Sequence, residues 1–205
     1  MSDSELKLFY SNAKGRAELI RLVLAAAGKQ FNDVRFAREE WPKYKVDAPF
    51  GQMPYMEIDG KFYSQSIALA TYFAREYGFC GKTNLESLQV DQVIQLIQDF
   101  VTVAAKMFHE KEEEKKGELI KTFKETDSPR LFGYVEAQLK ENGTGYLVGS
   151  ELSLADIAVY DFITGALVDL VCPLDNFPLV KTLTETVGQN ERIKKYVAER
   201  PATLM

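Results

Sequence analysis

The chain has 205 residues, of which 46% are hydrophobic and 27% are charged, and its net charge is −5 at pH 7. Nucleic acids and anionic membranes reward a concentrated excess of Lys and Arg, which this acidic composition lacks. There is no run of 18 apolar residues and no basic, apolar leader at the N-terminus. We therefore expect a cytoplasmic protein with neither nucleic acid nor membrane as a partner. Cys80 and Cys172 lack CxxC spacing and fit free thiols in a reducing compartment.

The N-terminal sequence alternates short strand-like and helical segments. "LKLFY" (residues 6–10) and "FNDVRF" (residues 31–36) are typical of strands. Between them, "RAELIRLVLAAAG" has apolar residues at helical spacing and a stop at Gly28. "EEWPKYK" predicts one or two helical turns.

A hairpin and a helix complete this half of the chain. Tyr55–Ile58 and "KFYS" flank Asp59-Gly60, which is a strong turn signal. "SIALATYFAREYG" then predicts a helix that stops at Gly78. Strand, helix, strand implies a parallel pair with a right-handed crossover, and the hairpin adds antiparallel strands. The order predicts an α/β thioredoxin-like N-terminal domain.

From about Leu85 the pattern is helical throughout. "LQVDQVIQLIQDFVTVAAKMF" has an apolar face, and "TDSPR" interrupts the next helical stretch so that Pro129 begins a new helix. "SLADIAVYDFITGALVDLV" predicts a buried central helix with a capping box at Ser153 and Asp156. "FPLVKTLTETVG" and "NERIKKYVAERP" predict the last two helices. We expect a thioredoxin-like domain at 1–78, a linker at 79–84 and an all-α domain at 85–205.

Two polar features adjoin the hairpin. Pro54, in "GQMPYMEI", lies immediately before a strand, where proline cannot donate to the ladder. Taken alone, it fits an ordinary loop proline better than a cis bond, since cis accounts for about 5% of X-Pro bonds. Ser66 begins an apolar helical run, so it can cap that helix or bind an anion there.

The segments "LFYSNAKGRAELIRLVLAAAG", "EEWPKYK", "PFGQMPYMEIDG" and "YSQSIALATYFAREYG", in this order, resemble sigma-class glutathione S-transferases. That class includes haematopoietic prostaglandin D synthase and the cephalopod S-crystallins. The resemblance covers the whole chain, down to "RPATLM". It implies the glutathione transferase fold, glutathione as co-substrate without a metal, and a homodimer. The implied activity is detoxifying transfer of the glutathione thiolate to small hydrophobic electrophiles.

The resemblance also implies roles for individual residues. It makes the Met53–Pro54 bond cis, which opens the Met53 backbone to the peptide, and it gives Tyr10 and Arg16 catalytic roles. The implied glutathione-binding residues are Tyr10, Trp41, Lys45, Gln52, Met53, Pro54, Gln65, Ser66 and, from the partner subunit of the homodimer, Asp99. The electrophile pocket would be lined by Ser11, Lys14, Lys106 and Met107.

Simple energetics support the role that the resemblance gives to Tyr10. A thiol of pKa about 8.5 is only about 3% ionised at pH 7, and lowering that pKa by about 2 units requires about 2.7 kcal/mol. One hydrogen bond to a charged group contributes about 1.5–3 kcal/mol. A single phenol can therefore supply most of the activation. Arg16 has an alternative as a helix-start residue paired with Glu18.

Three departures from the prostaglandin synthases leave other activities open. Gln95 and Gln98 stand where those enzymes carry metal-supporting aspartates, and Lys106 stands where they carry a tryptophan. Lys14 replaces a second arginine. The alternatives are a glutathione-dependent isomerase or peroxidase, and a ligand carrier or crystallin-like protein on the same fold.

Overall fold

The computed structural model of the chain describes residues 5–203. Its contacts divide the chain into two compact units. One unit comprises residues 1–77 together with 190–205, and the other comprises residues 78–189. The signal-peptide argument rests partly on residues 1–4, which lie outside the described residues.

The first unit is built on a four-stranded mixed sheet. Its strands are β1 (Leu6–Ser11), β2 (Asn32–Phe36), β3 (Tyr55–Ile58) and β4 (Lys61–Ser64). Their order is β2-β1-β3-β4, with β1 parallel to β2 and antiparallel to β3, which pairs antiparallel with β4. This arrangement confirms the thioredoxin-like layout predicted from the alternation of strands and helices.

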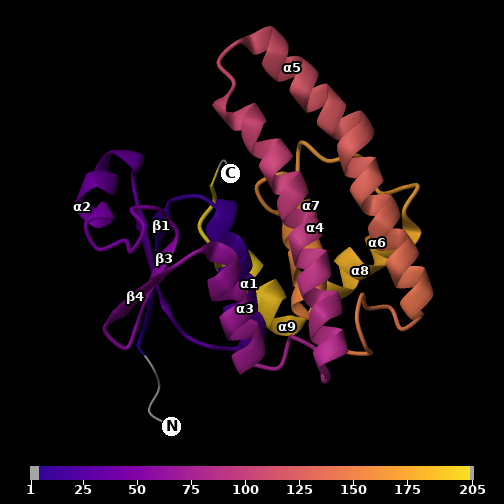
Figure 1. Ribbon diagram of the computed structural model, residues 1–205, viewed down its shortest axis with the longest axis horizontal. Helices are drawn as coiled ribbons and strands as arrows, with labels where there is room; N and C mark the ends of the chain where they lie inside the picture. Colours follow the sequence, from indigo (N-terminus) through magenta and orange to yellow (C-terminus); the bar gives the residue numbers. More distant parts are fainter. Residues whose placement is uncertain (1–4, 204–205) are drawn as a thin grey trace. The chain divides into compact units, whose positions relative to one another are not determined.

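Four helices accompany the sheet. They are α1 (Glu18–Ala27), α2 (Trp41–Lys45), α3 (Ser66–Glu76) and α9 (Glu191–Glu199). Helix α1 contacts both α3 and α9, and Figure 1 shows α1 and α3 on the same side of the sheet. A short 3-10 turn, Gly15–Ala17, leads from the loop after β1 into α1. The loop after β1 therefore leads directly into the start of a buried helix.

Successive side chains along each strand point to opposite faces of the sheet. Leu8 and Met56, which pair across β1 and β3, are fully buried. On the opposite face Phe9 stacks on Tyr55 with the ring centroids 4.7 Å apart, and both rings lie close to α2, where Tyr44 is 6.1 Å from Phe9. Side chains on both faces of the sheet are therefore packed, with Phe9 and Tyr55 on the face next to α2.

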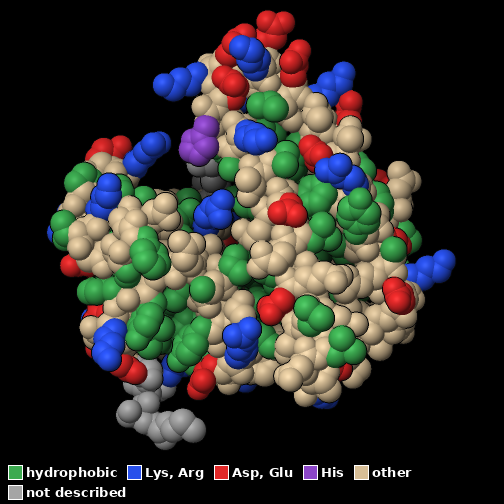
Figure 2. Space-filling model, in the orientation of Figure 1, with side chains coloured by type: hydrophobic (Ala, Val, Ile, Leu, Met, Phe, Trp, Pro, Cys, Tyr) green, Lys and Arg blue, Asp and Glu red, His purple; other side chains and the backbone are tan. Residues whose placement is uncertain are grey.

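The second unit contains helices and, in the part of the chain that the structure describes, no strand. Its helices are α4 (Asn84–His109), α5 (Glu113–Thr122), α6 (Ser128–Asn142), α7 (Leu154–Thr164) and α8 (Pro178–Gln189). Helix α7 packs against both α4 and α8 and is almost wholly buried, as its apolar sequence predicts. Figure 2 shows acidic and basic side chains gathered over the end of the unit formed by α4 and α5.

The sequence predicts that "TDSPR" interrupts the helical stretch and that Pro129 begins a new helix, and α6 does begin at Ser128 with Pro129 in its first turn. A π-helical turn, Phe123–Asp127, joins α5 to α6, so the helical path continues. Pro129 occupies the first turn of α6. Its missing N–H removes one hydrogen bond of the regular ladder. A wider turn just before it accommodates this loss without ending the helix.

The central helix is shorter than its apolar sequence predicts. The sequence favours a helix as far as Val171, but α7 ends at Thr164. A Cβ at Gly165 would lie 2.3 Å from the Asp161 carbonyl oxygen, so the chain turns where only glycine fits. Apolar composition alone could not distinguish the buried helix from the buried turn that follows it.

The C-terminal helix groups with the first unit. The sequence places residues 190–205 in the helical domain, whereas the contacts of the chain group them with the first unit, where α9 packs against α1. Arg192 donates to the Ala26 carbonyl at 3.2 Å, and Arg200 pairs with Glu18 at 2.6 Å. Within the described chain, none of the helices is both long and apolar enough to cross a membrane.

Candidate active site

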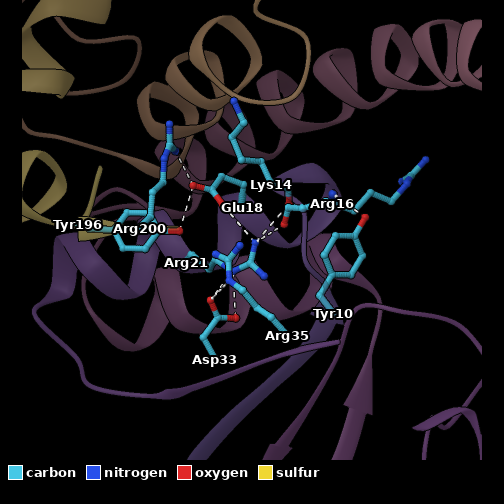
Figure 3. Close-up of polar contacts among 10 residues, drawn as sticks. Tyr10, Lys14, Arg16, Glu18, Arg21, Asp33, Arg35, Tyr196 and Arg200 are labelled. Carbon is cyan, nitrogen blue, oxygen red and sulfur yellow. Dashed lines mark hydrogen bonds and ion pairs between the residues drawn. The ribbon is translucent and has the colours of Figure 1, made fainter. Parts of the chain in front are cut away.

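Tyr10 lies near the end of β1, beside the loop that leads into α1. Its hydroxyl oxygen accepts a hydrogen bond from the Arg16 backbone N–H at 3.2 Å (Figure 3). A phenol has one proton to donate and can also accept. Because the amide is the donor in this bond, the Tyr10 proton remains available for another acceptor. The geometry therefore suits Tyr10 to donate to an anion.

The same loop brings Arg16 to Tyr10 through its backbone, whereas the Lys14 carbonyl accepts a hydrogen bond from Arg21. Arg16 is exposed, and Figure 3 shows its side chain extending away from the Tyr10 hydroxyl. Its contact with Tyr10 is made by the amide. Glu18, the alternative partner considered for Arg16, instead pairs with Arg21 and Arg200. Arg16 therefore contacts Tyr10 through its backbone amide and not through its charged side chain.

The segment before β3 has the backbone form that the resemblance implies. The Met53–Pro54 peptide bond is cis. Pro54 is buried, whereas Met53 is half-buried and Gln52 is exposed. Next to them, the Tyr55 hydroxyl donates to the Tyr44 carbonyl at 3.0 Å, which ties β3 to α2. Burial raises the pKa of Tyr55 to about 12, so this donor keeps its proton at neutral pH.

Helix α2 brings two further predicted residues to this segment. Trp41 stacks on Phe36, at the end of β2, with the ring centroids 5.9 Å apart. Lys45 is exposed, and its Cε would lie 3.3 Å from a Cβ placed at Gly51. Gly51 has φ +60°, a conformation that favours glycine. The lysine therefore lies over the loop that contains Gln52.

The remaining predicted residues of this unit lie where β4 meets α3. Gln65 has φ +76° and ψ 104°, which is unusual for a residue with a side chain. Ser66 is the first residue of α3 and is 9% exposed. The first amides of a helix have no partner within it, so this end attracts anions. Strained backbone of this kind clusters at functional sites.

The structure places the other predicted residues in two locations. Ser11 is the last residue of β1, next to Tyr10. Asp99, Lys106 and Met107 lie on α4, in the second unit. Asp99 and Lys106 are exposed, whereas Met107 is 2% exposed. The electrophile pocket stays a prediction.

Together, the polar groups of the first unit can hold an extended anionic peptide. The helix N-terminus at Ser66 and the ammonium of Lys45 favour negative charge, and the indole of Trp41 adds a donor. Tyr10 provides a donor with its proton free. Within residues 5–203, no group of three His, Cys, Asp or Glu side chains converges as a metal site.

Two residues of the site were missed by sequence reasoning. Gly15, with φ +44°, permits the Tyr10 hydroxyl to approach, since a Cβ there would lie 2.5 Å from that oxygen. Arg21 is fully buried, and its guanidinium carbon lies 5.8 Å from the centre of the Tyr10 ring. A signal in the sequence could have revealed Arg21. Glu18 and Arg21 stand three residues apart in an otherwise apolar helix, which indicates a buried ion pair.

A thioredoxin-like unit with this constellation defines a class of glutathione-dependent enzymes, and comparison with known proteins agrees. Residues 4–75 match the family "Glutathione S-transferase, N-terminal domain", and residues 98–200 match "Glutathione S-transferase, C-terminal domain". The chain is 37% identical to "Probable glutathione S-transferase 7" of Caenorhabditis elegans, over 96% of this chain and 97% of that protein. The chain belongs to the glutathione S-transferase family of enzymes.

Solved structures show the same similarity. A Nu-class glutathione S-transferase from Haemonchus contortus superposes with a TM-score of 0.84 at 34% identity, covering 98% of this chain and all of that one. A prostaglandin synthase D from Nilaparvata lugens superposes with a TM-score of 0.87 at 34% identity, covering 97% of this chain and all of that one. These relatives support the glutathione transferase fold, with its thioredoxin-like and all-helical parts.

Proposed function

We propose that this enzyme transfers the thiolate of glutathione to small hydrophobic electrophiles, in the manner of the sigma class. The observation that carries the proposal is the Tyr10 hydroxyl, which accepts from the Arg16 amide at 3.2 Å and keeps its own proton for the glutathione sulfur. The protein would position and ionise the thiol. No covalent enzyme intermediate is required.

Glutathione would lie along the open backbone of the first unit. The amide and carbonyl of Met53 would pair with its cysteinyl group as if the peptide were an added strand. Ser66 and Gln65 would hold the γ-glutamyl carboxylate at the start of α3, where free amides favour an anion. Trp41 and Lys45 would hold the glycyl carboxylate, with Gln52 as a further contact.

Activation of the sulfur would come from a hydrogen bond that strengthens with charge. A phenol donating to a thiolate is a charge-assisted bond, worth about 1.5–3 kcal/mol, or roughly one to two units of thiol pKa. The amide of Arg16 polarises the phenol by donating to its oxygen. The electrophile would be held by Ser11, Lys14, Lys106 and Met107.

The complete site would form in a cytoplasmic homodimer. Asp99, an exposed carboxylate on α4, would reach the α-amine of glutathione bound to the partner subunit. We expect Asp99→Ala to weaken glutathione binding about three- to tenfold. Asp91→Ala, a carboxylate two turns earlier on α4, serves as the matched control. Unchanged affinity in Asp99→Ala, measured by calorimetry on the dimer, would remove Asp99 from the site.

A glutathione-dependent isomerase is the second candidate, because a prostaglandin synthase D shares the fold at 34% identity. Gln95, Gln98 and Lys106 argue against it as the main activity, since the synthases carry two aspartates and a tryptophan at these positions. Peroxidase activity, or ligand carriage without turnover, would use the same surfaces. A prostaglandin endoperoxide substrate distinguishes the isomerase directly.

The proposed function is tested by two measurements on the purified protein. Retention on immobilised glutathione examines binding, and turnover of a chloronitrobenzene with glutathione examines conjugation. We expect the wild type to bind and turn over, and Tyr10→Phe to bind with turnover reduced at least tenfold. Binding without turnover in the wild type would support the carrier. Equal turnover in both proteins would exclude Tyr10 as the activator.

A further inference from the structure

The C-terminal helix α9 contacts a buried carboxylate at the start of α1. Arg200 donates to Glu18 Oε1 at 2.6 Å, and the Tyr196 hydroxyl donates to the same oxygen at 3.0 Å (Figure 3). Glu18 has no exposed surface. Burial and the charge of Glu18 raise the pKa of Tyr196, which therefore remains a donor. Tyr196 of α9 and Arg200, the residue that follows this helix, thus fix one oxygen of a fully desolvated carboxylate.

The other oxygen of Glu18 fixes a buried guanidinium. Arg21 Nη1 lies 3.2 Å from Glu18 Oε2, and neither side chain is exposed. On its other side, Arg21 Nε bonds Asp33 at 3.1 Å, and Arg35 pairs with the same carboxylate at 2.7 Å. A guanidinium held by carboxylates on two sides has little rotational freedom. Glu18 and Asp33 therefore determine where Arg21 can lie.

Arg21 in turn holds the loop that surrounds the Tyr10 hydroxyl. Its Nη1 donates to the Ala13 carbonyl at 2.8 Å and to the Lys14 carbonyl at 3.3 Å. The next residues along this loop are Gly15, on which the hydroxyl closely packs, and Arg16, whose amide bonds it. Figure 3 shows the ion pairs that join Arg21 to Glu18 and Asp33.

We propose that Arg21 is a positioning residue for Tyr10 and that α9 sets its position through Glu18. The path runs from Arg200 and Tyr196 to Glu18, then to Arg21, and from its guanidinium to the loop whose amide bonds the phenol. This inference rests on the proposed function, in which Tyr10 donates to the glutathione sulfur. It adds that the C-terminal helix controls the position of the Tyr10 hydroxyl.

The charge of the cluster acts in the same direction. Arg21, Arg35 and Arg200 contribute three positive charges, and Glu18 and Asp33 contribute two negative ones. Of these groups, Arg21 is fully buried and its guanidinium carbon lies 5.8 Å from the centre of the Tyr10 ring, where screening by solvent is weak. It favours an anion at the Tyr10 hydroxyl. Removal of Arg200 therefore takes away one of the donors that hold Glu18 and cancels the net positive charge of the cluster.

The experiment compares two arginines of the C-terminal segment, Arg192 in the first turn of α9 and Arg200 immediately after its end. Arg192 and Arg200 both anchor α9 to α1, but Arg192 bonds the Ala26 carbonyl and not Glu18. Arg200→Ala, Arg200→Lys and Tyr196→Phe are the test variants, and Arg192→Ala is the matched control for docking of the helix. The first readout is the ring ¹³C resonance of Tyr10 in the ligand-free protein, assigned by its loss in Tyr10→Phe. The second is kcat/KM with glutathione.

The two readouts separate this inference from the proposed function. We expect Arg200→Ala to shift the Tyr10 resonance and to lower kcat/KM about three- to tenfold, with Arg200→Lys restoring part of both. Arg192→Ala should leave the resonance in place at an equal loss of stability. Equal shifts in the two alanine variants, or none, would overturn the inference. A shifted resonance in a protein that neither binds nor uses glutathione would instead refute the proposed function alone.

Discussion

The hydroxyl of Tyr10 packs directly against Gly15, five residues later in the chain. A Cβ at position 15 would lie 2.5 Å from the phenol oxygen and 3.0 Å from the ring carbon Cε1. Contacts this short cannot persist, and the adjacent Arg16 amide holds the oxygen from the same loop. The absence of a side chain at Gly15 is therefore part of how the structure places its proposed catalytic donor.

We expect Gly15→Ala to displace the Tyr10 hydroxyl and to reduce turnover at least tenfold, with a smaller effect on glutathione affinity. Gly60→Ala is the control, because Gly60 also has positive φ but nothing lies within 4 Å of its Cβ position. The two variants share the backbone strain and differ in the clash. Equal losses of kcat in the two variants would mean that strain, and not the position of Tyr10, determines the effect.

The backbone conformation of Gln65 predicts that glycine is more stable than alanine at this position, which is the reverse of the usual order. At φ +76°, a side chain is strained by about 1–3 kcal/mol, and glycine is not. We expect Gln65→Gly to be more stable than Gln65→Ala by about 1 kcal/mol, as measured by urea unfolding. In most positions glycine is the less stable of the two. Both variants should bind glutathione more weakly, since both lack the side chain; the usual order of stability would show that the strain is not real.

The buried phenol of Tyr55 predicts a loss of stability at alkaline pH. Its pKa is about 12 in the folded protein, against 10.0 ordinarily, because burial disfavours the phenolate. The unfolded chain therefore gives up this proton first, and the free energy of unfolding falls as the pH rises from about 10 to 12.

Tyr55→Phe should remove this contribution, so its stability should fall less steeply over the same range of pH. At pH 8 the variant should be less stable by about 1 kcal/mol, because the Tyr44 carbonyl loses its donor. Tyr63→Phe, an exposed tyrosine of β4, is the control. Parallel curves for wild type and Tyr55→Phe would contradict the raised pKa.

Among the residues outside the site, we expect substitution of Asp156 to cause the largest loss of stability. It accepts from the amides of Leu147 and Ser153 at 2.8 and 2.7 Å and from the Ser153 hydroxyl at 2.6 Å, and it is fully buried. Asparagine has only one oxygen to offer these donors. We expect Asp156→Asn to lower the free energy of unfolding by about 2–4 kcal/mol. Asp169→Asn, on the surface, should change it by less than about 0.5 kcal/mol.

The sequence predicts most of the fold because its local signals agree with one another. Asp59 and Gly60 both have positive φ, which is the turn that their dipeptide favours between two short strands. Ser153 and Asp156 form the capping box that their spacing indicates at the start of α7. Such features depend on neighbours in sequence, and residue type alone determines them.

The errors lie where contacts distant in sequence decide the outcome. Pro129 marks a helix start as predicted, but the π-helical turn that joins α5 to α6 has no signature in the sequence. The docking of α9 on α1 depends on Arg200 reaching Glu18, which is 182 residues away. Arg21 went unrecognised because its partners include Asp33 on β2 and the Ala13 and Lys14 carbonyls of the loop after β1, which only the fold brings to its guanidinium. Periodicity cannot report pairings of this kind.

The site shows the same division. Tyr10 was identified through family resemblance, but the donor that fixes its hydroxyl is the Arg16 amide, and the Arg16 side chain is exposed. Backbone groups carry no signature in the sequence. The conformation of Gln65 is likewise invisible until φ is known. Residue identity therefore indicates the chemistry, and the geometry that would deliver it comes from the fold.

The most direct test of this account is the pKa of the glutathione thiol bound to the enzyme, followed by the ultraviolet absorbance of the thiolate as the pH is varied. We predict a pKa about 1–2 units below the value of about 8.5 for a free thiol in the wild type, and a return to near that value in Tyr10→Phe. A bound thiol that ionises at the same pH in both proteins would contradict the assignment of Tyr10 as the donor to sulfur.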